Sequence, residues 1–241
     1  MLRFTLFGFP VLIHWMFWLN AALMGGALSA SSPEQLRGLI GWMVAVFLSI
    51  LIHELGHAFT MRNCGDRRVG IVLYAFGGLA QGSNHLTRKE DLLVSAAGPG
   101  LQILFGLAVG WSITLWRVPS PWLLAMLDSF TIISLFWALL NLVPVVPLDG
   151  GRLCQAWLGA GKQRLALTIS LVCSVALALL SFQNQLWKGL QNSVLDFLDI
   201  RVDPNMRVGG GVFTLILFGM LAWNSWKQLR HEPQIPWMNA R

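Results

Sequence analysis

The sequence predicts an all-α polytopic membrane protein with about six transmembrane helices and a small β-hairpin or re-entrant element between the second and third helices. Of its 241 residues, 55% are hydrophobic and only 12% are charged, whereas an average soluble domain has about 25% charged residues. Apolar stretches of about 18 residues or more recur along the chain, and each is long enough to cross the hydrocarbon core of a bilayer. The lipid bilayer is therefore the expected environment.

The apolar stretches predict six spans, and two of the segments between them have structure of their own. Between the second and third stretches, VGIVLYAFGGLAQG at 69–82 is rich in β-branched and aromatic residues around a Gly77-Gly78 turn, which predicts the hairpin. Mixed polar and apolar residues at 183–208 predict an interfacial helix and a loop. The expected spans are residues 10–28, 39–60, 92–116, 122–147, 163–182 and 209–227.

The basic residues indicate orientation rather than nucleic-acid binding. The net charge is +6, but the 17 Lys and Arg residues are spread singly along loops and form no basic stripe with interleaved aromatic residues. Six spans put both termini on the same side as the connections after the second and fourth spans, where most of the basic residues fall. The positive-inside rule then predicts cytosolic termini, in what we expect to be a bacterial cytoplasmic membrane.

LIHELGHAFT at 51–60 places three ionisable side chains inside a very apolar stretch. Each such group at bilayer depth costs roughly 2.5–3.5 kcal/mol by insertion scales, so the three need partners or a function. His53 and His57 are four residues apart and project from one face of a helix, where both imidazoles can bind one metal ion. Glu54 lies beside them, close to where a metal-bound water would be. The spacing matches H-E-x-x-H, which predicts a zinc hydrolase site.

A catalytic zinc has three protein ligands and one open position, so the third ligand must come from elsewhere. Most acidic residues fall in loops or on the expected outer side of the membrane. Asp149, in NLVPVVPLDGG at 141–151, falls at the cytosolic end of the fourth span, at the expected depth of His53 and His57. Two prolines before it break the helix and two glycines after it permit a sharp turn. We therefore expect Asp149 to reach the metal from a non-helical segment.

HELGH at 53–57, together with NLVPVVPLDGG, resembles the site-2 protease family of zinc intramembrane metalloproteases. The resemblance covers most of residues 8–155, and Gln102 stands where the family commonly has Asn. Weaker matches are Pro10, His14, FGGLAQG at 76–82 and AAGPGLQ at 96–102.

The resemblance implies one zinc ion per chain, with His53, His57 and Asp149 as ligands and Glu54 as the catalytic base. It implies a zinc-dependent endopeptidase that cleaves within or near transmembrane segments of membrane-protein substrates, as in regulated intramembrane proteolysis. We expect a single membrane domain over 1–241, with a catalytic core at about 8–155, additional helices and the interfacial segment at 156–241, and no PDZ or CBS domain.

A helical substrate must be extended before its carbonyls can be attacked. An unpaired edge of the 69–82 hairpin could bind the extended substrate by strand addition, which makes Gly77 and Gly78 candidate substrate-binding residues. Asn141 is a further candidate for binding the substrate backbone, although an interhelical hydrogen bond would explain it equally well.

Three alternatives remain open at this stage. A transporter could bind zinc between its helices but would not need Glu54 beside the ligands. A zinc-binding scaffold with the same ligands could bind membrane partners without cleaving them. A structural membrane protein with a buried histidine pair would bind no stoichiometric metal. The many small residues also leave a homo-oligomer or a regulatory membrane partner open.

Overall fold

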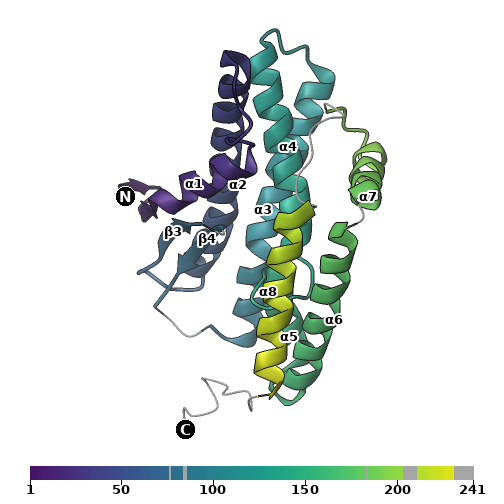
Figure 1. Cartoon of the computed structure of the whole chain (residues 1–241). Coiled ribbons are helices and arrows are strands. Elements are labelled where there is room, and N and C mark those ends of the chain that lie inside the picture. The colour runs from purple at the N-terminus through teal and green to yellow at the C-terminus, as the bar shows by residue number, and fades with distance from the viewer. Residues whose placement is uncertain (76, 84–85, 183, 203–210, 231–241) are drawn as a thin grey trace. The chain divides into compact units, whose positions relative to one another are not determined.

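The computed structural model describes residues 1–75, 77–83, 86–182, 184–202 and 211–230. Within this part of the chain, helices predominate and a small sheet is formed near the N-terminus (Figure 1). The strands are β1 (Leu2–Leu6), β2 (Phe9–Ile13), β3 (Gly70–Tyr74) and β4 (Gly77–Gln81). The α-helices are α1 (Trp15–Met24), α2 (Pro33–Asn63), α3 (Arg88–Leu115), α4 (Pro121–Asn141), α5 (Asp149–Leu158), α6 (Gln163–Phe182), α7 (Asn184–Phe197) and α8 (Gly211–Arg230).

The chain divides into two compact units. The first contains Met1–Leu140 and Gln191–Val208, and the second contains Asn141–Leu190 and Gly209–Arg241. The first unit holds the sheet and helices α1 to α4, with α2 packed against both α3 and the hairpin of β3 and β4 (Figure 1). In the second unit α6 packs against α5 and α8, and Ser170 of α6 is hydrogen-bonded to Ser225 of α8 at 2.7 Å.

The sheet contains four strands in the order β1-β2-β3-β4. The hairpin expected at 69–82 is present as the antiparallel pair β3 and β4, in which Tyr74 faces Gly77. Strand β2 runs parallel to β3 and antiparallel to β1. The all-α expectation is therefore wrong at the N-terminus, where a second hairpin joins the first through a parallel pairing that local sequence patterns do not reveal.

The first expected span, 10–28, is not one helix. Alternate residues of β2, among them Val11 and Ile13, are buried in the core, and the backbone N–H of His14 donates to the carbonyl of Leu73 at 2.9 Å. Only ten residues remain in α1, which at 1.5 Å per residue rises about 15 Å, half the thickness of the hydrocarbon core. The apolar residues at 10–13 belong to the sheet, because all four pair with β1 and residues 11–13 also pair with β3.

Four helices of the described chain are long and apolar enough to cross a membrane: Pro33–Asn63, Arg88–Leu115, Pro121–Asn141 and Gln163–Ser181. They correspond to the expected second to fifth spans. Capping boxes mark where two of them begin, because Ser32 and Gln35 at α2, and Thr87 and Glu90 at α3, exchange side-chain to backbone hydrogen bonds. The fourth expected span, 122–147, ends earlier than predicted, at Asn141, just before Pro144.

The C-terminal end of α3 is covered by the segment after α7. Trp111 donates from Nε1 to the carbonyl of Leu198 at 3.0 Å, the backbone N–H of Arg201 donates to Thr114 Oγ1 at 3.2 Å, and Ile200 is buried in the core. Of the expected interfacial segment 183–208, α7 supplies the helix, while residues 183 and 203–208 lie outside the described residues.

Candidate metal centre

The H-E-x-x-H residues occupy the C-terminal half of α2, where the helix packs against α3 and the sheet. His53, Glu54 and His57 are all buried, at 4–6% exposure. The four-residue spacing puts both imidazoles on one face, with ring centroids 4.7 Å apart. The expectation that both imidazole rings lie on one helical face is thus confirmed.

Hydrogen bonds to oxygen acceptors orient both rings and place a proton on each Nδ1. His57 Nδ1 lies 2.7 Å from the backbone carbonyl of Val94, and His53 Nδ1 lies 2.8 Å from the side-chain oxygen of Gln102. Carbonyl and carboxamide oxygens only accept hydrogen bonds, so each Nδ1 must carry a proton and donate it. In a neutral imidazole the other nitrogen, Nε2, then presents a lone pair.

The two Nε2 atoms of His53 and His57 lie 3.0 Å apart. Two lone pairs at this distance repel each other unless a proton or a cation lies between them. Two nitrogens that each bind one zinc at about 2.0–2.1 Å in tetrahedral geometry lie roughly 3.3–3.4 Å apart, which differs by only a few tenths of an ångström. The donor set therefore fits a zinc ion bound to both Nε2 atoms.

Strand β4 passes directly over Glu54. A Cβ atom built on Gly78 would collide with the side chain of Glu54, including its carboxylate. Gly77, beside it, has a φ of +138°, a conformation that glycine adopts readily and other residues avoid. The Gly77-Gly78 pair thus lets the sheet approach the carboxylate next to the histidines.

The AAGPGLQ segment of α3 brings that helix close to α2. A Cβ atom at Gly56 would collide with the backbone of Ala97 and Gly98, and a Cβ atom at Gly98 would collide with the imidazole of His57. These glycines let the two helices pack with their backbones almost in contact, as small residues do at membrane helix interfaces.

Asp149 belongs to the second unit and is the first residue of α5, where it is buried. Gly150 and Gly151 lie in the same helix and do not form the sharp turn that we expected. Instead, Cβ atoms there would collide with the backbone carbonyls of Leu142 and Val145, respectively. The segment between α4 and α5 folds tightly over the start of α5, and this requires glycine at both positions.

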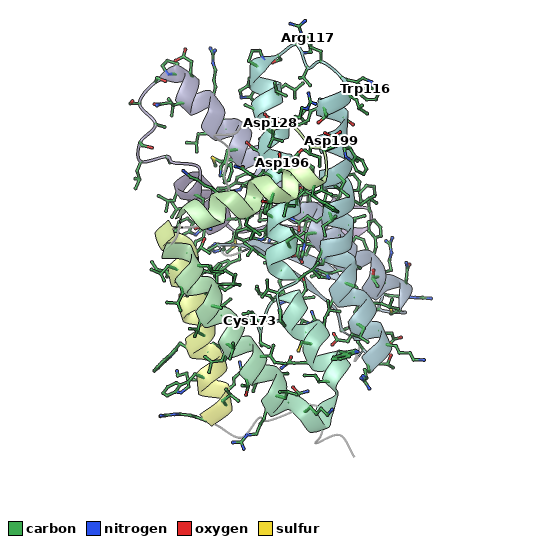
Figure 2. The ribbon with its side chains drawn as sticks, turned by 90° about the vertical axis from the view of Figure 1, so that its right-hand side faces the viewer. Trp116, Arg117, Asp128, Cys173, Asp196 and Asp199 are labelled. Atoms are coloured by element: carbon green, nitrogen blue, oxygen red, sulfur yellow. The ribbon has the colours of Figure 1, made fainter. Side chains whose placement is uncertain are left out.

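His53 and His57 of the first unit and Asp149 of the second are all buried, and Asp149 stays the predicted third metal ligand. Other acidic residues lie elsewhere in the first unit: Figure 2 shows Asp128, Asp196 and Asp199 towards the end of the unit where Trp116 and Arg117 follow α3.

No family model matches the chain, but individual proteins do. It is 30% identical over 197 residues to Rip3 of Mycobacterium tuberculosis, named as a zinc metalloprotease, over 73% of this chain and 50% of Rip3. It is 27% identical over 158 residues to zinc metalloprotease MJ0392 of Methanocaldococcus jannaschii, over 64% of this chain and 44% of that protein. Stage IV sporulation protein FB of Bacillus subtilis is 31% identical over 151 residues, 58% of this chain and 45% of that protein.

The solved structure of a site-2 protease from Methanocaldococcus jannaschii shares the fold, with a TM-score of 0.59 over 95% of both chains at 20% identity. The sequence relatives and the shared fold together support the site-2 protease family for this chain. The chain spans about half the length of the relatives that it matches. The individual roles of the motif residues remain predictions.

The sequence reasoning overlooked the residues that support the histidines. Val94 and Gln102 hold the two rings, and Gly98 makes room for one of them. Asn141, the predicted substrate-binding residue, is half-buried at the end of α4, and its role remains a prediction. The AAGPGLQ resemblance was the available signal for α3, but it gave no indication of which atoms these residues would contact.

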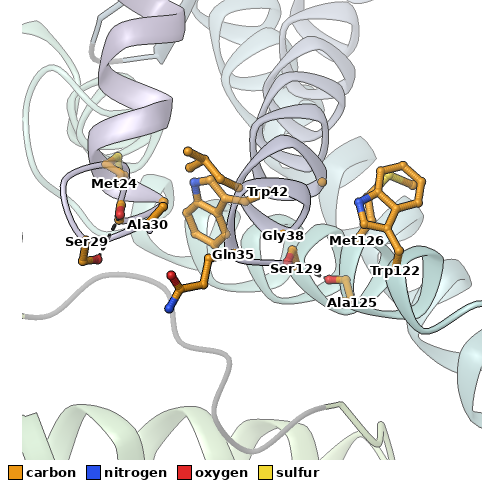
Figure 3. Close-up of a pocket in the computed structure, with 14 residues that line it drawn as sticks. Met24, Ser29, Ala30, Gln35, Gly38, Trp42, Trp122, Ala125, Met126 and Ser129 are labelled. Carbon is orange, nitrogen blue, oxygen red and sulfur yellow. Dashed lines mark hydrogen bonds between the residues drawn. The ribbon is translucent and has the colours of Figure 1, made fainter. Parts of the chain in front are cut away.

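A separate cavity of about 350 Å³ lies where the connection between α1 and α2 meets the start of α4 (Figure 3). Its lining includes Trp42 and Trp122, whose indole nitrogens donate to the carbonyls of Ala21 and Arg37 at 3.1 and 2.8 Å. None of the predicted site residues lines it, so it is distinct from the candidate metal centre.

Proposed function

We propose that this chain is a zinc-dependent endopeptidase that hydrolyses peptide bonds within or near transmembrane segments of membrane-protein substrates. The observation that carries the proposal is the approach of the Nε2 atoms of His53 and His57 to 3.0 Å, beside the buried Glu54 and with each Nδ1 hydrogen-bonded to an oxygen acceptor. The likeness to the site-2 protease family supports the same activity.

One zinc ion per chain would be held by His53, His57 and Asp149. Two neutral imidazoles and one carboxylate are a ligand set of catalytic zinc sites, which leave a fourth position open. When bound, zinc polarises the scissile carbonyl and activates water for attack. The carboxylate of Glu54 takes a proton from the attacking water and passes it to the departing amide nitrogen as the C–N bond breaks.

The sheet offers a way to present an extended substrate to Glu54. Strand β4 forms one edge of the sheet, and Gly78 within it lies against the Glu54 side chain. A substrate strand added to that edge would form main-chain hydrogen bonds and bring its carbonyls near Glu54. Gly77 and Gly78 are the proposed substrate-binding residues, and Asn141 is a further candidate for the same role.

The proposed topology has six crossings, with both termini cytosolic and the metal centre near the cytosolic face of a bacterial cytoplasmic membrane. Helix α8, with 20 residues, has the length for a fifth crossing. The sixth crossing would need α1 together with the connection that follows it. The distribution of basic residues supports this orientation.

The proposed domain organisation is a single protease domain over 1–241, with its core at about 8–155. The partners would be a transmembrane protein substrate and the bilayer, with no nucleic acid. A second copy of the chain or a regulatory membrane protein would pair through small residues.

The test compares wild type with Glu54→Gln in detergent. Zinc per chain is quantified, and each protein is incubated with a panel of single-span substrates. We expect both proteins to hold about one zinc and only the wild type to cleave. Zinc in both without cleavage by either would favour the scaffold or transporter, and cleavage by Glu54→Gln at the wild-type rate would exclude Glu54 as the base. If neither the wild type nor Glu54→Gln holds zinc, the remaining interpretation is a structural histidine pair that binds no metal.

A further inference from the structure

A chain of buried hydrogen bonds leads away from His53 across three helices of the first unit. Gln102 of α3 accepts from His53 Nδ1 through Oε1 at 2.8 Å and donates through Nε2 to Ser49 Oγ of α2 at 2.8 Å. Ser49 Oγ lies 2.9 Å from Ser134 Oγ of α4. Gln102, Ser49 and Ser134 are all at 0% exposure.

The two histidines are held by different kinds of partner. His57 is oriented by the backbone carbonyl of Val94, which every residue type would supply. His53 is oriented by the Gln102 side chain, and a side-chain amide can present either its oxygen or its NH₂ group. If the amide turned over, its NH₂ group would face Nδ1 and favour the tautomer that protonates Nε2, the atom that should bind the metal.

Ser49 holds the amide in the required orientation. It precedes His53 by four residues, so both side chains lie on one face of α2, and Gln102 spans the helical turn between them. Because Ser49 Oγ accepts from Gln102 Nε2, its own proton is available to Ser134 Oγ. Gly106 lets α4 approach, since a Cβ atom there would contact Ser134 and Leu135.

We propose that Gln102 is a positioning residue of the metal centre, which keeps His53 Nε2 unprotonated and directed at the metal with the support of Ser49 and Ser134. The proposal rests on the zinc site of the proposed function. Such partners of ligating histidines typically change metal affinity 10–100-fold when mutated. A merely structural role would instead make Gln102 an interhelical contact, whose loss lowers stability without changing zinc affinity.

The experiment measures zinc affinity by chelator competition for the full chain in detergent. We expect Gln102→Leu, which cannot accept from Nδ1, to bind zinc about 10–100-fold more weakly. Gln102→Glu restores an acceptor and should bind within a few-fold of wild type. The visible absorption spectrum of the cobalt-substituted protein should change in Gln102→Leu and resemble that of wild type in Gln102→Glu, because it reports ligand geometry.

The matched control is Ser95→Ala. Ser95 lies on the same helix and is equally buried, but its Oγ has no hydrogen-bond partner among the described residues. The zinc affinity of Ser95→Ala should equal that of wild type. If Gln102→Leu does not fold, Ser49→Ala replaces it, and we expect weaker zinc binding there because the amide is no longer held in one orientation.

The outcomes separate this proposal from the proposed function. If the wild type binds zinc and Gln102→Leu, or its replacement Ser49→Ala, binds zinc equally tightly, the positioning role of Gln102 is overturned. The proposed function then still stands. A loss in Ser95→Ala as large as that in Gln102→Leu also overturns it, because the effect would then be general. Wild type that binds no zinc overturns the proposed function and this proposal with it.

Discussion

Gly98 of α3 lies against the imidazole of His57 so closely that a Cβ atom at position 98 would overlap the ring. The position of His57, a predicted metal ligand on α2, therefore requires glycine at position 98 of α3. This contact links helix packing directly to the metal centre.

Gly98→Ala should destabilise the protein and weaken zinc binding. Overpacking of a buried site costs typically about 1–3 kcal/mol, and the added methyl group would displace the His57 ring. Two quantities are measured on the full chain: its free energy of unfolding in denaturant and its zinc content.

Gly100→Ala is the matched control, because position 100 is exposed and a Cβ atom there meets nothing within 4 Å. It should be neutral or slightly stabilising, since alanine favours a helix over glycine by up to about 1 kcal/mol. Equal zinc content and stability in both variants would contradict the close packing at Gly98.

Gly78→Ala should separate catalysis from metal binding. The added Cβ would push against the Glu54 carboxylate, while the two histidines keep their hydrogen bonds. We expect zinc per chain to be unchanged and cleavage to fall about 100-fold, since small misplacements of a catalytic group have effects of that size.

Leu79→Ala, at the next position of β4, serves as its control because Leu79 is 53% exposed. If the two variants cleave equally well, β4 does not restrict Glu54.

Asp149→Asn tests the third ligand. A neutral amide is a much poorer zinc ligand than a carboxylate, so zinc affinity should fall at least about tenfold, and cleavage should fall with it. Chelator competition gives the affinity.

Asp128→Asn is the corresponding control, because Asp128 is also a buried carboxylate but lies in α4 and is not one of the predicted metal ligands. Zinc binding by Asp149→Asn as tight as that by Asp128→Asn would mean that another residue completes the site.

Metal removal should abolish cleavage reversibly. A chelator should remove zinc from the proposed site, and readded zinc should restore activity. Magnesium should not, because it prefers oxygen ligands in octahedral geometry. Activity that survives complete removal of zinc would rule out a metalloprotease.

Most of the long helices could be predicted from sequence, because hydrophobic length is a local property. The expected span 163–182 coincides with α6, and the spans 39–60 and 92–116 fall on α2 and α3, which begin six and four residues earlier. The prediction was wrong at 10–28, where an apolar run of strand length was merged with a short helix. Strand β2 pairs with β1 in a local hairpin and with β3, about sixty residues further along the chain.

At the site, the sequence alone determined how the motif residues are arranged: the i, i+4 spacing of His53 and His57 puts both rings on one helical face with Glu54 beside them, wherever that helix packs. Only the tertiary structure decided the state of those rings. The tautomer of His53 depends on Gln102 and that of His57 on Val94, both on another helix. Hydrogen bonds and close packing between distant segments are set by how the helices meet, and the local spacing of residues does not encode them.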